Sequence, residues 1–198
     1  MTVSPAPPLP DVSLSLRLGG RTVDLATRAV VVAVVPPPRF GREAEVLAGV
    51  RAAALAGADV VEVPADSRLL GPAAAGGELP IAAQVTTSAA ARAAWAAGAR
   101  LLLVPASDAD EVAAGRGTDD DWQVAVLVTT AQDGRDRVLA TKEPGLPVAL
   151  DTAPLDRVDA VSEESLALAV GVRLVRTTDI RRTRRVVEVM AHLLEARR

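Results

Sequence analysis

The chain of 198 residues is 49% hydrophobic and 24% charged, with a formal net charge of −3, the profile of one soluble globular domain. It has no cysteine and a single histidine, His192, which excludes thiolate nucleophiles, cysteine-ligated metals and multi-histidine metal sites. Two tryptophans and one phenylalanine are too few for a base-stacking surface. We therefore expect no metal, no cofactor and no nucleic-acid partner.

The first ten residues are rich in proline and lack both the basic start and the apolar core of a signal peptide. We predict a disordered lead-in over residues 1–10, a single domain over 11–198, and a cytoplasmic protein that does not enter the membrane. Residues 13–25 form two alternating apolar runs around Gly19-Gly20, a pattern typical of a β-hairpin.

From residue 29 onward, short continuous apolar runs alternate with alanine-rich helical stretches, which indicates strands buried on both faces and an α/β fold. Helical stretches such as 42–55 and 88–97 end at Gly-Ala pairs, which suit helix C-caps. Segment 131–145 is ambiguous, because Asp133-Gly134 suits either a hairpin turn or a frayed helix. The predicted strands are 29–35, 59–63, 81–85, 101–104, 123–128, 147–150 and 173–175.

Seven strand–helix units after a hairpin favour a (β/α) barrel, with a doubly wound sheet as the alternative. A full TIM barrel has eight strands and about 250 residues. We therefore predict a shortened TIM-like barrel of seven or eight strands, whose N-terminal end is closed by the hairpin. Because such barrels bind ligands at the carboxyl ends of their strands, the site should lie in the loops that follow the strands.

These loops contain few side chains capable of chemistry. Asp66, Ser67 and Arg68 follow the second strand and combine an acid, a hydroxyl and a base, although a solvated loop with a helix N-cap is the simpler interpretation. Gln84 ends the third strand. Asp151 follows the sixth, where a carboxylate could be functional or could equally cap a turn.

The final strand leads through Arg176 into a helix that begins near Asp179. Free backbone N–H groups, the helix dipole and Arg176 could together bind an anion, although Asp179 would compete by capping the helix. The helical segment 181–198 has an apolar surface too broad for one barrel face, which predicts a symmetric dimer. Its apolar residues are Val186, Val187, Val189, Met190, Leu193 and Leu194.

Taken together, these segments resemble dihydropteroate synthase, the pterin-binding barrel that joins 6-hydroxymethyl-dihydropterin pyrophosphate to p-aminobenzoate. The resemblance begins at about residue 16 and covers LRLGGRTVDL (16–25), ALAGADVVEV (54–63), residues 80–99 and GVRLVRTTDI (171–180). It implies a TIM-like barrel and a homodimer formed through the C-terminal helices.

The motif residues of the family correspond less well. By the resemblance, the family's pterin-binding Asp falls on Gln84 and its Asn on Leu103. Its C-terminal Arg and Asp are kept as Arg176 and Asp179, whereas its His becomes Thr178. The first mobile loop, Asn-Val-Thr-Pro-Asp-Ser-Phe in the family, is VVPPPRF here, so its Asn and Asp are absent.

Two further motifs are only partly kept. The family's Glu-Ser-Thr-Arg-Pro loop resembles residues 66–70, which keep Ser67 and, with a shift of one residue, Arg68. In one alignment, Asp151 corresponds to the carboxylate of the family's Asp-Pro-Gly, and the Ser-Arg-Lys strand is missing. In the other, residues 147–152 are the strand that ends in Ser-Arg-Lys in the family, and the Asp-Pro-Gly unit is deleted. In both alignments the catalytic lysine has no counterpart.

Each unmatched hydrogen-bonding group would cost about 1–3 kcal/mol of substrate binding. The resemblance therefore implies a pseudoenzyme, a non-catalytic partner or scaffold whose ligand, if any, is anionic or pterin-like. Two alternatives stay open: a transferase or hydrolase remodelled for a smaller phosphorylated ligand, and a true dihydropteroate synthase of folate biosynthesis.

Overall fold

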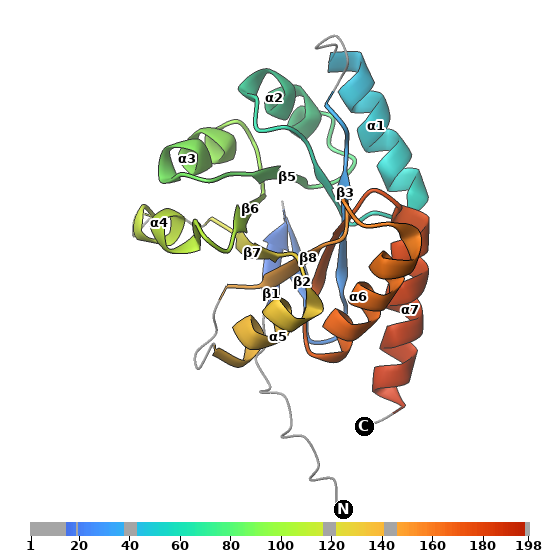
Figure 1. Cartoon of the computed structure of the whole chain (residues 1–198). Coiled ribbons are helices and arrows are strands. Elements are labelled where there is room, and N and C mark those ends of the chain that lie inside the picture. Colours follow the sequence, from blue (N-terminus) through green and yellow to red (C-terminus); the bar gives the residue numbers. More distant parts are fainter. Residues whose placement is uncertain (1–14, 19, 38–42, 117–121, 141–145, 197–198) are drawn as a thin grey trace, which may run out of the picture.

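The computed structural model describes residues 15–18, 20–37, 43–116, 122–140 and 146–196. The predicted lead-in 1–10 and the single lysine, Lys142, lie outside these residues. Seven parallel strands close into a barrel in chain order, because β9 pairs with β3 (Figure 1). This closure confirms the barrel and excludes the doubly wound sheet. The strands are β3 (Val30–Val34), β4 (Val60–Glu62), β5 (Ile81–Gln84), β6 (Leu101–Pro105), β7 (Val124–Val128), β8 (Val148–Asp151) and β9 (Leu174–Thr177).

A helix follows each barrel strand and covers the outside of the barrel (Figure 1). A barrel strand such as β3 is apolar on both faces, because one face packs inside the barrel and the other packs against the helices. In β3, Val30 and Val32 pack inside the barrel, whereas Val31 packs outward against Val187 of α7. The helices are α1 (Glu43–Ala56), α2 (Ser67–Ala75), α3 (Ser88–Ala96), α4 (Ala109–Ala114), α5 (Ala131–Ala140), α6 (Arg157–Ala169) and α7 (Ile180–Glu195).

The predicted hairpin is present and forms the floor of the barrel. Strands β1 (Ser15–Leu18) and β2 (Arg21–Asp24) pair antiparallel, and Leu16, Leu18 and Leu25 are buried in the cluster that fills the barrel interior. Arg17, between the two leucines, is exposed. The hairpin therefore closes the N-terminal end of the barrel, as its alternating pattern predicts.

The two Gly-Ala pairs, Gly57-Ala58 and Gly98-Ala99, end helices as predicted, and Gly171 has the same role after α6. Gly57, Gly98 and Gly171 adopt φ values of 94°, 107° and 99°, a left-handed conformation that other residues rarely adopt. At Gly98 a side chain is also excluded by packing, because an added Cβ would lie 2.6 Å from Cβ of Ala74. Each glycine turns the chain from a helix into the next strand.

The described part of the ambiguous segment, residues 131–140, forms a helix, α5, and not a hairpin. The Thr130 hydroxyl lies 2.7 Å from an Asp133 carboxylate oxygen and accepts a hydrogen bond from the Asp133 N–H at 3.1 Å, so the two side chains cap the first turn. Gly134 is needed for close packing, since an added Cβ would approach Val172 Cγ2 to 2.9 Å. The glycine that suggested a turn thus brings α5 close to the barrel.

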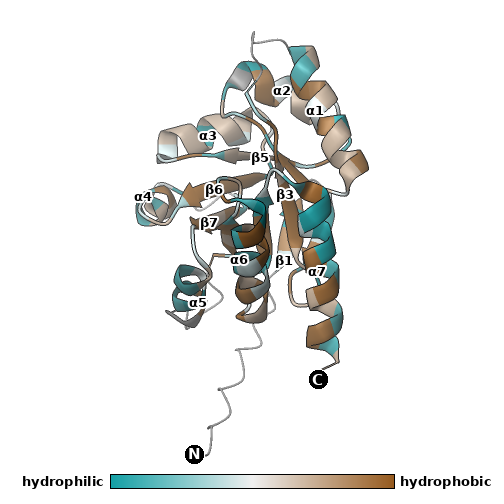
Figure 2. Ribbon diagram, turned by 45° about the vertical axis from the view of Figure 1, so that its right-hand side comes forward, coloured by the Kyte–Doolittle hydropathy of each residue, from teal (hydrophilic) through white to brown (hydrophobic). Residues whose placement is uncertain are grey.

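Figure 2 shows α6 and α7 on one side of the barrel, with polar and apolar residues mixed along both. Within the described residues, no helix has the length and hydropathy needed to span a bilayer.

Candidate functional site

Three charged side chains from three different strands meet at the carboxyl end of the barrel. Arg176 of β9 donates from Nε to Glu62 Oε2 at 2.5 Å and from NH2 to Glu62 Oε1 at 2.8 Å. Its NH1 group donates to both carboxylate oxygens of Asp151 on β8, at 2.9 and 3.0 Å. Asp151 and Arg176 are Cα partners in the parallel register, which places their side chains together. We call these three residues the mouth cluster.

The mouth cluster is largely buried and carries a net charge of −1 when all three groups are ionised. The side chains of Arg176, Glu62 and Asp151 are 13%, 9% and 19% exposed. Burial lowers the pKa of Arg176, but the hydrogen bonds and charges of Glu62, followed by those of Asp151, outweigh burial and raise that pKa above its ordinary value. The guanidinium therefore stays charged, and its charge is already balanced within the protein.

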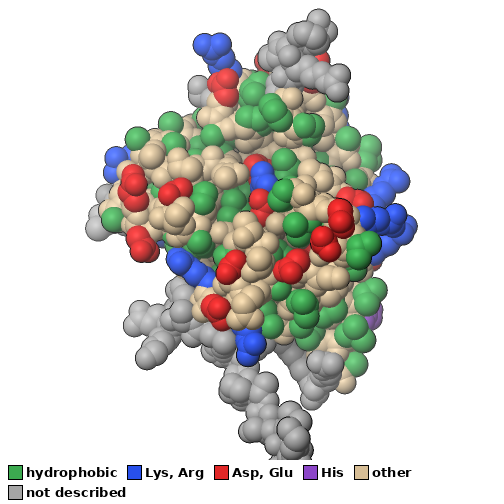
Figure 3. Space-filling model, viewed as in Figure 1, with side chains coloured by type: hydrophobic (Ala, Val, Ile, Leu, Met, Phe, Trp, Pro, Cys, Tyr) green, Lys and Arg blue, Asp and Glu red, His purple; other side chains and the backbone are tan. Residues whose placement is uncertain are grey.

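A cavity of about 430 Å³ lies next to the mouth cluster, between the ends of β5 to β8 and the start of α5. Its polar side chains include Gln84, Asp133, Asp136, Arg137 and Asp151. Figure 3, viewed as in Figure 1, shows acidic side chains over α4, α5 and α6 on this face. The charged side chains that line the cavity, among the described residues, are thus three carboxylates and one guanidinium. The rest of its lining comprises Pro105, Ala106, Leu127, Val128 and Thr129.

The structure brings three of the residues predicted from the sequence together at the mouth. Gln84 and Asp151 both line the cavity, and Arg176 contacts Asp151. Asp179 instead caps α7, where its Oδ1 accepts the N–H of Arg182 at 3.2 Å. It does not line the cavity, so it serves as the helix cap that the sequence also allowed.

The loop after β4 also provides a helix cap. Asp66 accepts the backbone N–H of Arg68 at 2.9 Å, and the Arg68 side chain is exposed. Ser67 is the first residue of α2, and its side chain lies outside the described part of the structure. Arg68 does not line the mouth cavity, and with the Asp66 cap this favours the simpler interpretation of this loop as a solvated turn with a cap.

Sequence reasoning missed Glu62, the principal partner of Arg176. The available signal was a carboxylate at the end of a strand that is otherwise apolar and buried on both faces. Asp136 and Arg137 were missed because segment 131–145 could not be assigned to a helix. Without that helix, nothing in the sequence places these two residues beside Asp151.

The barrel interior below the mouth is apolar. Leu103 of β6 is fully buried in the interior cluster and is the Cα partner of Gln84 on β5. By the resemblance, this pair stands where the family has an Asn and an Asp that contact pterin. In this chain Leu103 lies in the apolar core, and Gln84 lines the mouth cavity.

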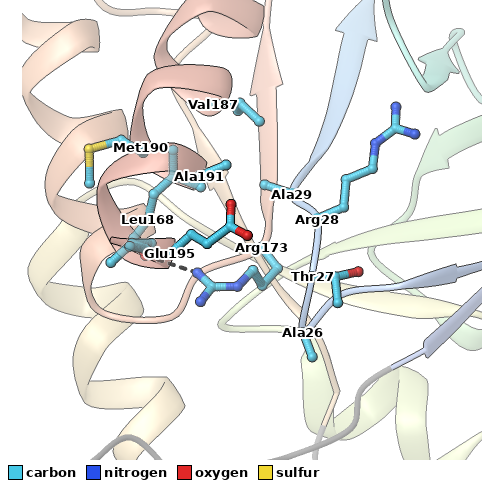
Figure 4. A pocket seen from close by; sticks show the side chains of 11 residues that line it. Ala26, Thr27, Arg28, Ala29, Leu168, Arg173, Val187, Met190, Ala191 and Glu195 are labelled. Carbon is cyan, nitrogen blue, oxygen red and sulfur yellow. Dashed lines mark hydrogen bonds between the residues drawn. The ribbon is translucent and has the colours of Figure 1, made fainter. Parts of the chain in front are cut away.

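A second cavity, of about 210 Å³, lies at the other end of the barrel between α7 and residues 26–29 (Figure 4). Ala29 and Arg173, which line it, come directly before β3 and β9, and Arg173 donates to the Leu168 carbonyl at 2.9 Å. Barrels of this type bind ligands at the carboxyl ends of the strands, so the mouth is the candidate site. Nowhere in the described ranges do three His, Asp or Glu side chains cluster as metal ligands.

Solved structures with similar folds include dihydropteroate synthases. The Xanthomonas albilineans enzyme in complex with 7,8-dihydropteroate has a TM-score of 0.65 and 18% identity, covering 91% of this chain and 98% of that chain. The Yersinia pestis enzyme has a TM-score of 0.67 and 14% identity, covering 92% and 100%. Rv1207 of Mycobacterium tuberculosis has a TM-score of 0.65 and 21% identity, covering 91% and 97%.

No model of a protein family matches the sequence, and no curated protein matches it. The structural comparisons confirm the resemblance to dihydropteroate synthase at the level of the fold. The chain therefore has the dihydropteroate synthase fold, with seven barrel strands in place of the eight of a TIM barrel.

Proposed function

We propose that this protein is a dihydropteroate synthase-like binding protein without synthase activity. The observation that carries the proposal is the pairing of Arg176 with both Glu62 and Asp151. The synthase reaction releases pyrophosphate, so its site must stabilise developing negative charge with cations or hydrogen-bond donors. Here the strand-end cation is balanced by two carboxylates, and an anionic leaving group would be repelled by the net charge of the mouth cluster.

The ligand that suits this mouth is a small molecule rich in hydrogen-bond donors. The carboxylates of Asp133, Asp136 and Asp151 line the cavity, and pterin-like rings carry amino and ring N–H donors that carboxylates accept. A pterin-like ligand therefore fits these residues better than the anion expected from Arg176. The complex of the Xanthomonas albilineans enzyme makes 7,8-dihydropteroate a suitable probe.

A non-catalytic partner also needs a surface on which to associate. Helices α6 and α7 expose large apolar side chains: Val158 is 74% exposed, Leu166 58%, Val189 57% and Leu193 55%. Exposed apolar residues on two neighbouring helices favour burial against a second copy of the chain. We infer a homodimer formed through α6 and α7.

Thermal unfolding with added ligands tests the proposed binding. We expect 7,8-dihydropteroate to raise Tm, and pyrophosphate to leave it unchanged. At about 100 times Kd, a bound ligand stabilises the folded state by about 2.7 kcal/mol. Asp136→Asn, in the cavity, should weaken the effect of dihydropteroate, whereas Asp159→Asn, on the exposed surface of α6, should not. No effect of dihydropteroate at any soluble concentration would contradict the proposal.

Arg137 favours one second candidate, a transferase or hydrolase acting on a small phosphorylated ligand. It is the one cation among the described residues that line the cavity, and it lies beside carboxylates able to act as acid or base. Stabilisation by pyrophosphate that is lost in Arg137→Ala would favour this candidate over the pterin-like ligand.

A further inference from the structure

Glu164 of α6 is a carboxylate buried behind the mouth cluster. Its side chain is 0% exposed, and its Oε1 accepts hydrogen bonds from Thr152 Oγ1 at 2.9 Å, Arg182 NH2 at 2.7 Å and Thr183 Oγ1 at 2.7 Å. Arg182 and Thr183 lie in the first turn of α7. One buried oxygen thus connects α6, α7 and the loop that follows β8.

Thr152 links Glu164 to the mouth cluster. It directly follows Asp151, and its backbone N–H donates to the carbonyl oxygen of Arg176 at 2.9 Å. Its hydroxyl, which contacts Glu164, also lies 3.1 Å from the same carbonyl oxygen. Thr152 is therefore attached both to Glu164 and to the backbone of Arg176.

Thr177 provides a second link on the other side. It directly follows Arg176, and its hydroxyl oxygen accepts from Arg182 NH2 at 3.1 Å and lies 3.0 Å from the Thr183 hydroxyl. Arg182 and Thr183 are the same two residues that contact Glu164. The neighbours of Asp151 and of Arg176 are therefore both held by one buried network.

This network is not optimised for stability alone. Oε2 of Glu164 and Nε of Arg182 are buried and have no hydrogen-bond partner among the described residues. A buried ion pair is often no more stabilising than apolar side chains of similar size, whereas its hydrogen bonds have fixed directions. The fixed directions of these hydrogen bonds suit the orientation of two segments, the residues after Asp151 and those after Arg176.

We propose that Glu164, acting with Arg182, is a positioning residue that fixes Asp151 and Arg176 in the mouth cluster. Its importance for ligand binding rests on the proposed function of the mouth. The positioning itself requires no ligand, because it concerns the pairing of Arg176 with Glu62 and Asp151. It can therefore be tested on the free protein.

The test measures hydrogen exchange of arginine Nε–H groups by NMR on the full chain. The Arg176 signal is assigned by its loss in Arg176→Lys. Glu164→Gln should accelerate Arg176 Nε–H exchange by about tenfold or more, since the loops that hold the guanidinium would open more often. Arg184 is the internal reference, because its Nε donates to the Gly57 carbonyl at 2.9 Å at the other end of the barrel. Its exchange should not change.

Equal acceleration of both signals would show a purely structural role and overturn the proposal, as would an unchanged Arg176 signal. Thr152→Val and Thr152→Ser form a matched pair for the case in which Glu164→Gln does not fold. Valine removes the hydroxyl and should accelerate Arg176 exchange, whereas serine keeps it and should not. Equal behaviour of the two variants would also overturn the proposal. If the wild-type protein does not bind dihydropteroate but its Arg176 Nε–H group still exchanges slowly, only the proposed function is contradicted.

Discussion

Gln84 of β5 and Leu103 of β6 are Cα partners, so the two residues that the resemblance aligns with the family's pterin-binding Asp and Asn lie side by side in the barrel. We expect the purified protein to form no dihydropteroate from dihydropterin pyrophosphate and p-aminobenzoate, since the leucine offers no hydrogen bond and the mouth cluster repels pyrophosphate. Product analysis by chromatography, with the Yersinia pestis enzyme as positive control, measures this. Product formation that is lost in Gln84→Ala would contradict the prediction.

Arg176 is expected to be necessary for stability. Arg176→Ala leaves Glu62 and Asp151 as unpaired, largely buried carboxylates, which should lower the free energy of unfolding by about 3–5 kcal/mol. Urea denaturation measures the loss. The control is Arg28→Ala: Arg28 is 56% exposed and its partner Asp59 keeps Arg184, so the loss should not exceed about 1 kcal/mol. Equal losses would show that the mouth cluster contributes no more than a surface pair.

The wild-type protein should not bind orthophosphate or pyrophosphate at the mouth. The residue order of the last strand and helix suggests an anion site at Arg176, but Glu62 and Asp151 already occupy the guanidinium and Asp179 caps the helix. Isothermal calorimetry at millimolar ligand is the measurement. If the wild type binds either anion and Arg176→Ala abolishes that binding, Arg176 forms an anion site after all. The argument for a ligand rich in hydrogen-bond donors would then fail.

The hairpin floor should contribute strongly to the stability of the barrel. Leu16 is 1% exposed, so Leu16→Ala should cost about 2–5 kcal/mol through lost burial and the cavity it leaves. Arg17→Ala, one residue away on the exposed face, should change stability by about 0.5 kcal/mol or less. Chemical denaturation of both variants tests this, and similar values would show that the hairpin packs only loosely on the barrel.

Association through α6 and α7 can be measured by light scattering. We expect a dimer for the wild type and a monomer for Leu193→Asp, because a charge on an exposed apolar position opposes burial in an interface. Ala93→Asp places the same charge on an exposed residue of α3 and should leave the dimer intact. A wild-type monomer at high micromolar concentration would remove the dimer from the proposal.

Local patterns predicted most of the architecture, because strand burial, helix caps and the hairpin each depend on neighbouring residues. The site was less predictable, because Glu62 is 114 residues from Arg176 and Asp151 is 25 residues from it. Such a contact depends on how the strands close, and composition carries no information on it. Gly134 illustrates a second limit: its close approach to Val172 is visible only once α5 is packed on the barrel.

The hairpin floor formed by Leu16, Leu18 and Leu25 has a consequence for the order in which ligands bind and dissociate. In the described part of the chain these leucines fill the lower end of the barrel, so a compound held at the mouth arrives and departs through the same opening. If two compounds occupy the mouth together, the deeper one must arrive first and depart last. An outer compound would therefore slow the escape of the inner one, and dissociation rates measured with and without the outer compound would reveal this order.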